Sequence, residues 1–176
     1  MTNFSSSLLA IGLFSLSWFS NADITSNPET ETVVPGEEQA PDFVINTVDG
    51  QEISLKKSLK QGKPTVIYFT ASWCPMCAKN WPSLSEVYPE YKDKLNFVAI
   101  SIDPTDDAEV MRKLAKERDI TFPVAAGDAQ LMLDFGVKAQ ATTVGVDKKG
   151  EIYFKKRAVL SSEEYRQMFD KLLQAS

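Results

Sequence analysis

Two cysteines separated by two residues are the part of this chain best suited to chemistry. Cys74 and Cys77 are the only cysteines among 176 residues, and they lie between an apolar run, 65–70, and a stretch with a helical pattern. A thiol in the first turn of a helix faces unpaired N–H groups and the positive end of the helix dipole, which together lower its pKa. We therefore expect Cys74 to be an exposed nucleophile. Cys77, one turn deeper, would attack the mixed disulfide that Cys74 forms.

Three non-catalytic interpretations of the pair explain less. A disulfide across two residues closes too short a loop to stabilise a fold by much. A structural zinc site needs four ligands, and one copy of this chain offers two cysteines and no histidine. Two buried thiols that pack as small apolar groups remain an alternative. That alternative does not account for their position between a strand and a helix.

The composition bounds the other classes of function. With 43% hydrophobic residues, the chain suits one globular domain with a proper core. Its net charge of −5 argues against a nucleic-acid partner, because phosphate contacts need clustered Lys and Arg. The absence of histidine removes the commonest general base and metal ligand. Chemistry must therefore depend on the cysteines, carboxylates, Tyr, Lys or backbone groups.

The N-terminal residues predict export. An apolar run at 8–19 is followed by Ser20, Asn21 and Ala22, with small residues where a cleavage site needs them, so we expect residues 1–22 to be a signal peptide. An uncleaved membrane anchor is the alternative, and no Lys or Arg precedes the run. Residues 23–39 are acidic and contain two prolines, which predicts a flexible linker before a domain at 40–176. In the periplasm, or another exported compartment, thiols can be oxidised.

The hydrophobic periodicity predicts an α/β fold, with helices flanking a mixed central sheet and an N-terminal strand pair. We expect Asp106 and Glu109 at the positive end of the second helix. Its core face would consist of Val110, Met111 and Leu114. The predicted strands are 42–46, 52–55, 65–70, 96–102, 142–147 and 151–156, and the predicted helices are 75–91, 106–118, 128–135 and a last helix that begins at Ser161.

A strand, then "WCPMC", then a helix resembles the active site of the thioredoxin superfamily. The segments "APDF" (40–43), "TFPV" (121–124) and "FGVKAQATTVGVDKKG" (135–150) are similar to its exported TlpA/ResA-like branch, whose domains are of the AhpC/TSA redoxin type. The resemblance implies a thioredoxin-like fold and a thiol-disulfide oxidoreductase. Such an enzyme exchanges disulfides with protein substrates as a reductant, receives electrons from a membrane donor, and needs no cofactor beyond the Cys74–Cys77 disulfide.

The resemblance also implies a substrate groove beside the cysteines. The matching positions are Trp73, Pro75, Gln140, Ala141 and Thr142. Family members have a cis-proline where this chain has Ala141. A cis bond before alanine would cost about 2.5–4 kcal/mol, so we expect a trans peptide there. We also expect proline to be accepted at this position without loss of the fold, and the missing proline leaves a metal bound between two chains as an alternative.

The second departure from the family is the absence of a buried acid. Thioredoxin has Asp where this chain has Tyr68, and the TlpA-like branch often has Glu where this chain has Asn80. Water, or Tyr68 if it points inward, would then move the proton of the buried thiol. The interpretation that we favour for Tyr68 is an ordinary strand residue.

Two other classes of function share this fold. A peroxiredoxin-type peroxidase would have Thr or Ser three residues before its cysteine, but Ala71 occupies that position and Thr70 precedes it. A copper-binding protein could use the two thiolates with Met76 as a soft ligand, but related carriers add a histidine that this chain lacks. We expect Trp81 to pack in the core.

Overall fold

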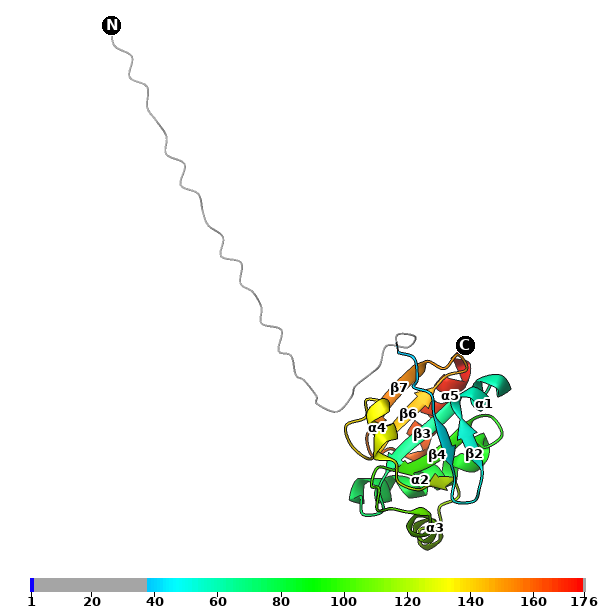
Figure 1. Cartoon of the computed structure of the whole chain (residues 1–176). Coiled ribbons are helices and arrows are strands. Elements are labelled where there is room, and N and C mark those ends of the chain that lie inside the picture. Colours follow the sequence, from blue (N-terminus) through cyan, green and yellow to red (C-terminus); the bar gives the residue numbers. More distant parts are fainter. Residues whose placement is uncertain (2–37, 176) are drawn as a thin grey trace.

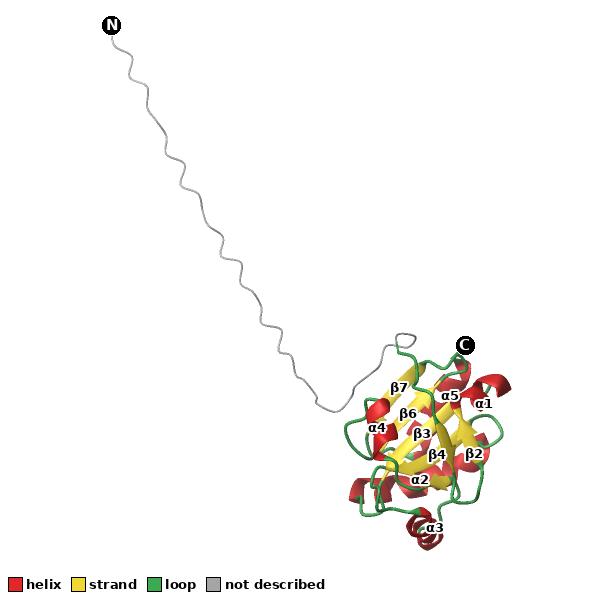
Figure 2. Ribbon diagram, in the orientation of Figure 1, coloured by secondary structure: helices red, strands yellow, loops and turns green. Residues whose placement is uncertain are grey.

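A five-stranded mixed sheet with helices on both faces forms the body of the protein (Figures 1 and 2). The computed structural model describes Met1 and residues 38–175, so the predicted signal peptide and nearly all of the predicted linker lie outside the described residues. The sheet order is β5-β4-β3-β6-β7, and β1 and β2 form a separate antiparallel pair. The strands are β1 (Val44–Asn46), β2 (Glu52–Ser54), β3 (Thr65–Thr70), β4 (Asn96–Ser101), β5 (Val124–Ala125), β6 (Thr142–Val146) and β7 (Ile152–Arg157). The helices are α1 (Leu55–Gln61), α2 (Pro75–Tyr91), α3 (Ala108–Glu117), α4 (Ala129–Asp134) and α5 (Ser162–Gln174).

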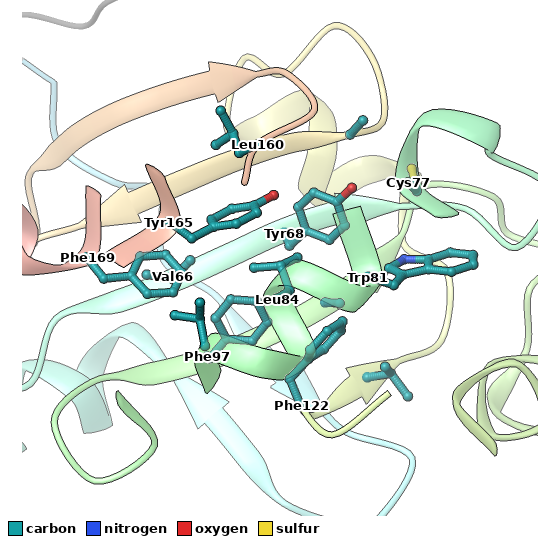
Figure 3. Close-up of a cluster of buried hydrophobic side chains, with 14 of the residues drawn as sticks. Val66, Tyr68, Cys77, Trp81, Leu84, Phe97, Phe122, Leu160, Tyr165 and Phe169 are labelled. Carbon is teal, nitrogen blue, oxygen red and sulfur yellow. The ribbon is translucent and has the colours of Figure 1, made fainter. Parts of the chain in front are cut away.

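The central strand β3 is buried on both faces, as its continuous apolar run predicts. Val66 and Tyr68 face the core that α2, α3 and α5 cover, whereas Ile67 and Phe69 face the core shared with the β1–β2 pair and α4. Figure 3 shows the first of these cores, with Trp81 inside it. Trp81 is 2% exposed, which confirms its predicted packing role.

The strand register brings the candidate active-site segments to one edge of the sheet. β3 runs parallel to β4, with Thr70 opposite Ser101, and antiparallel to β6, with Phe69 opposite Thr142. The carboxyl ends of β3 and β4 and the start of β6 therefore meet. This is the edge at which open α/β sheets usually bind ligands.

Most predicted elements are confirmed, and the α/β fold with its mixed sheet is as expected. The predicted last helix begins after Ser161, where Ser161 and Glu164 form a capping box. The sequence interpretation missed α1 and β5, which have only seven and two residues. Elements this short carry too little periodicity to stand out in the sequence.

The predicted start of the 106–118 helix is wrong. α3 begins at Ala108, and Asp107 is its N-cap because its side chain accepts hydrogen bonds from the N–H groups of Glu109 and Val110. Asp106 does not lie at the helix end; it is buried and faces another part of the chain. Val110 is 37% exposed, so of the predicted core face only Met111 and Leu114 are buried.

None of the helices that the structure describes is long and apolar enough to cross a membrane.

Candidate active site

Cys74 and Cys77 form a disulfide at the start of α2, with their Cα atoms 5.2 Å apart. Cys74 is the N-cap of the helix and Pro75 its first residue, where a missing N–H costs nothing. The Cys74 Sγ atom accepts a hydrogen bond from the Cys77 N–H at 3.0 Å. The Cys74 sulfur therefore occupies the position that an N-cap side-chain oxygen takes in an ordinary helix.

The disulfide is covered in this structure. Cys74 is 1% exposed and Cys77 is fully buried, so the expectation of an exposed Cys74 is wrong for the disulfide form. Both cysteines belong to the same buried cluster as Ala71 and Ala141. Because Ala141 comes from a distant segment of the chain, the burial of the cysteine pair depends on the fold and not on sequence spacing.

Trp73 stands beside the disulfide with 57% of its surface exposed. Its indole N–H donates to Asp103 Oδ2 at 2.8 Å, so the ring is held by the β4–α3 loop, residues 102–107. The other oxygen of Asp103 accepts hydrogen bonds from the N–H and hydroxyl of Thr105. These bonds, those of Thr105 first and that of Trp73 next, hold the pKa of Asp103 below its ordinary value.

The segment before β6 has an unusual backbone at Ala141. The structure has no cis peptide bond among the described residues, which confirms the expected trans bond before Ala141. Ala141 has φ = 62°, in the left-handed region, and its N–H donates to the Phe69 carbonyl at 2.8 Å. Proline has φ near −65° and no N–H. Proline at this position would therefore need a different backbone conformation and would lose the hydrogen bond to Phe69, which argues against the expectation that it is accepted without loss of the fold.

The five predicted groove residues lie at the same sheet edge but differ in exposure. Trp73 and Pro75 are exposed, and Gln140 is half-buried with its carbonyl accepting from the Arg157 Nε–H at 3.1 Å. Ala141 and Thr142 are buried. A partner that docks on this form of the protein would therefore contact Trp73 and Pro75, because almost none of Ala141 or Thr142 is accessible.

Tyr68 points into the core (Figure 3). Its hydroxyl accepts a hydrogen bond from the Asn80 amide at 3.1 Å. Burial raises the pKa of Tyr68 far above its ordinary value of 10, so the phenol keeps its proton at neutral pH. Asn80 also donates to the Ala158 carbonyl at 2.8 Å, and its oxygen accepts from the Leu160 N–H at 2.9 Å. A neutral pair thus occupies the two positions for which the resemblance implies carboxylates.

The sequence interpretation missed the two carboxylates that the β4–α3 loop brings to this site, Asp103 and Asp106. A signal was present, because both follow the predicted strand at 96–102, and the carboxyl ends of adjacent parallel strands meet at one edge. Among residues 38–175, no group of three or more His, Cys, Asp or Glu side chains lies close enough together to hold a metal ion.

Comparisons with known proteins support the fold and the type of chemistry. The sequence profile of the AhpC/TSA family matches residues 37–155. The chain is 31% identical to the thioredoxin-like protein YneN of Bacillus subtilis, over 76% of this chain and 78% of YneN. It is 30% identical to the thiol-disulfide oxidoreductase ResA of Bacillus thuringiensis, over 76% of each. The crystal structure of a thiol:disulfide interchange protein of the thioredoxin family from Chlorobium tepidum superposes with a TM-score of 0.66 at 25% identity, covering 80% of this chain and 98% of that one.

Proposed function

Because the chain belongs to the AhpC/TSA family and is a thiol-disulfide oxidoreductase, we propose that Cys74 is its nucleophile and Cys77 its resolving thiol. One observation carries this assignment: the Cys77 N–H donates to Cys74 Sγ at the N-cap of α2. In the reduced protein the same N–H and the positive end of the helix stabilise a thiolate on Cys74. Cys77 is already inside the helix and has no such position.

Disulfide exchange at this pair proceeds in two steps that balance. The Cys74 thiolate attacks one sulfur of a substrate disulfide, and the other substrate sulfur leaves as a thiolate that takes up a proton. The Cys77 thiol then loses its proton and attacks Cys74 Sγ, which expels the second substrate sulfur. The protein dithiol is thereby oxidised to the disulfide, and the substrate disulfide is reduced to two thiols.

The proton of Cys77 has no carboxylate acceptor in the Tyr68–Asn80 pair behind it. Tyr68 lies in the same buried cluster as Cys77, and its hydroxyl stays protonated. Tyr68 can therefore pass a proton only if it gives up its own at the same time, and water is the final acceptor. The attack of Cys77 therefore becomes the slower of the two steps as the pH falls, because less of its thiol is deprotonated.

We further propose that the enzyme works as a reductant of protein disulfides in the periplasm or another exported compartment. The apolar run at 8–19 supports export, and the exposed Trp73 and Pro75 beside the disulfide suit a protein partner. A reductant must be reduced again after each turnover, and we propose that a dithiol donor at the membrane supplies the two electrons. The disulfide itself is the redox group, with no added cofactor.

Alkylation of the reduced protein tests the assignment. The Cys77→Ser variant should keep a thiol that reacts with iodoacetamide with an apparent pKa below the free value of about 8.5, whereas Cys74→Ser should react slowly at neutral pH. A fast thiol in Cys74→Ser would reverse the two roles.

The potential of the pair against glutathione tests the direction of electron flow. A value near roughly −270 mV marks a reductant, and one near roughly −120 mV marks an oxidant.

A further inference from the structure

We propose that Asp106 is a positioning residue whose carboxylate holds the turn before Cys74, so that the Cys74 sulfur stays at the N-terminus of α2. The proposal rests on the proposed role of Cys74 as the nucleophile. It assigns a function to a residue that the helix pattern had placed elsewhere.

Asp106 is 3% exposed and accepts three hydrogen bonds from two serines. The Ser72 N–H donates to Oδ2 at 2.8 Å, and the Ser72 hydroxyl donates to Oδ1 at 2.6 Å. The Ser101 hydroxyl, at the end of β4, donates to Oδ2 at 2.6 Å. Hydrogen bonds to a carboxylate are among the strong ones, particularly when they are buried. Ser72 is therefore fixed to the end of the neighbouring strand.

The backbone around Asp106 is itself held from two sides. Its N–H donates to the Asp103 carbonyl at 3.0 Å, and its carbonyl accepts from the Gly127 N–H at 2.8 Å. A side chain at Gly127 would overlap the Asp103 carbonyl, so only glycine lets these two segments pass this closely. These contacts fix the backbone of Asp106, and a residue that positions another group needs such a fixed backbone.

Ser72 connects Asp106 to the reactive sulfur. The Cys74 N–H closes the turn by donating to the Ala71 carbonyl at 3.1 Å, and Ser72 lies inside that turn. In the oxidised protein the disulfide also ties Cys74 to Cys77. Once the disulfide is reduced, the turn and its bonds to Asp106 must keep Cys74 Sγ next to the Cys77 N–H. Loss of Asp106 should therefore affect the reduced form more than the oxidised form.

Two substitutions separate positioning from charge. Asp106→Ala removes all three hydrogen bonds. Asp106→Asn can keep them, with its oxygen in the place of Oδ2, accepting from the Ser72 N–H and the Ser101 hydroxyl, and its amide donating to the Ser72 hydroxyl oxygen. Asp107→Ala is the matched control, because it removes the same charge from the adjacent exposed residue and costs α3 its N-cap without contacting Ser72.

The readouts are the alkylation rate of Cys74 in the full chain as a function of pH, measured in a Cys77→Ser background, and the potential of the Cys74–Cys77 pair. For Asp106→Ala we expect alkylation about tenfold slower at neutral pH, an apparent thiol pKa about one unit higher, and a more negative potential, because the reduced form loses its stabilisation. For Asp106→Asn and Asp107→Ala we expect rates within about threefold of the parent, since both keep the turn.

The proposal is overturned if Asp106→Ala reacts as fast as Asp107→Ala, or if Asp106→Asn is as slow as Asp106→Ala. If Asp106→Ala does not fold, Ser72→Ala takes its place, since it removes one of the three bonds and keeps the backbone bond. A slowing of about threefold supports the proposal, and no slowing overturns it. A parent thiol that reacts no faster than free glutathione refutes instead the role of Cys74, so the two failures are distinguishable.

Discussion

Replacing Ala141 with glycine should leave the stability of the protein nearly unchanged, although deleting a buried methyl group normally destabilises a fold. Ala141 is fully buried, and its φ of 62° lies in the region that alanine tolerates poorly. Its N–H still bonds to the Phe69 carbonyl, and glycine keeps that bond. The substitution therefore changes only the methyl group and the conformational freedom of the residue.

Three contributions set the size of the effect. Loss of the buried methyl costs about 0.8 kcal/mol. The greater freedom of glycine in the unfolded chain costs about 0.5–1 kcal/mol. Relief of the left-handed backbone returns about 1–2 kcal/mol. The free energy of unfolding should therefore change by less than about 1 kcal/mol in either direction.

Ala99→Gly is the matched control. Ala99 is equally buried but lies in β4, where alanine carries no such strain, so its replacement should cost about 1.3–1.8 kcal/mol. Urea unfolding of the oxidised protein, followed by tryptophan fluorescence, measures both variants. If Ala141→Gly loses as much stability as Ala99→Gly, the argument from backbone strain is wrong.

Three further predictions follow from the same structure. Ala141→Pro should destabilise the protein by more than about 2 kcal/mol in the same assay, because the φ angle cannot be kept and the Phe69 carbonyl loses its donor. Asn80→Ala should cost about 2–4 kcal/mol and speed hydrogen exchange of the backbone N–H that it leaves unpaired after β7. Arg166→Gln should make the free energy of unfolding fall less steeply as the pH is lowered. The pKa of Glu90 is held below its ordinary 4.5 mainly by the hydrogen bonds from Arg166, so this pair adds stability that is present above about pH 4.5 and lost as the pH falls below it.

Each of these predictions has a clear contrary result. Wild-type stability of the proline variant, unchanged exchange in Asn80→Ala, or an acid limb that is identical with and without Arg166 would each contradict the argument behind it.

The sequence alone determined the type of chemistry and most of the elements that position it. Two cysteines, a buried strand before them and an amphipathic helix after them are local features that neighbouring residues specify. The N-cap geometry of Cys74 also follows from local backbone sterics, since Pro75 starts a helix well and leaves the preceding residue to cap it.

Only the tertiary structure decided how the cysteine pair is held. Asp106 reaches Ser72 across 34 residues, and the choice between Asp106 and Asp107 as the helix cap depends on packing that periodicity does not encode. The burial of Cys74 and the left-handed backbone of Ala141 likewise arise where segments distant in the chain meet. The local sequence pattern indicates which conformation a residue prefers. The contacts and the burial of a side chain depend on the strand register, which brings β3, β4 and β6 to one edge.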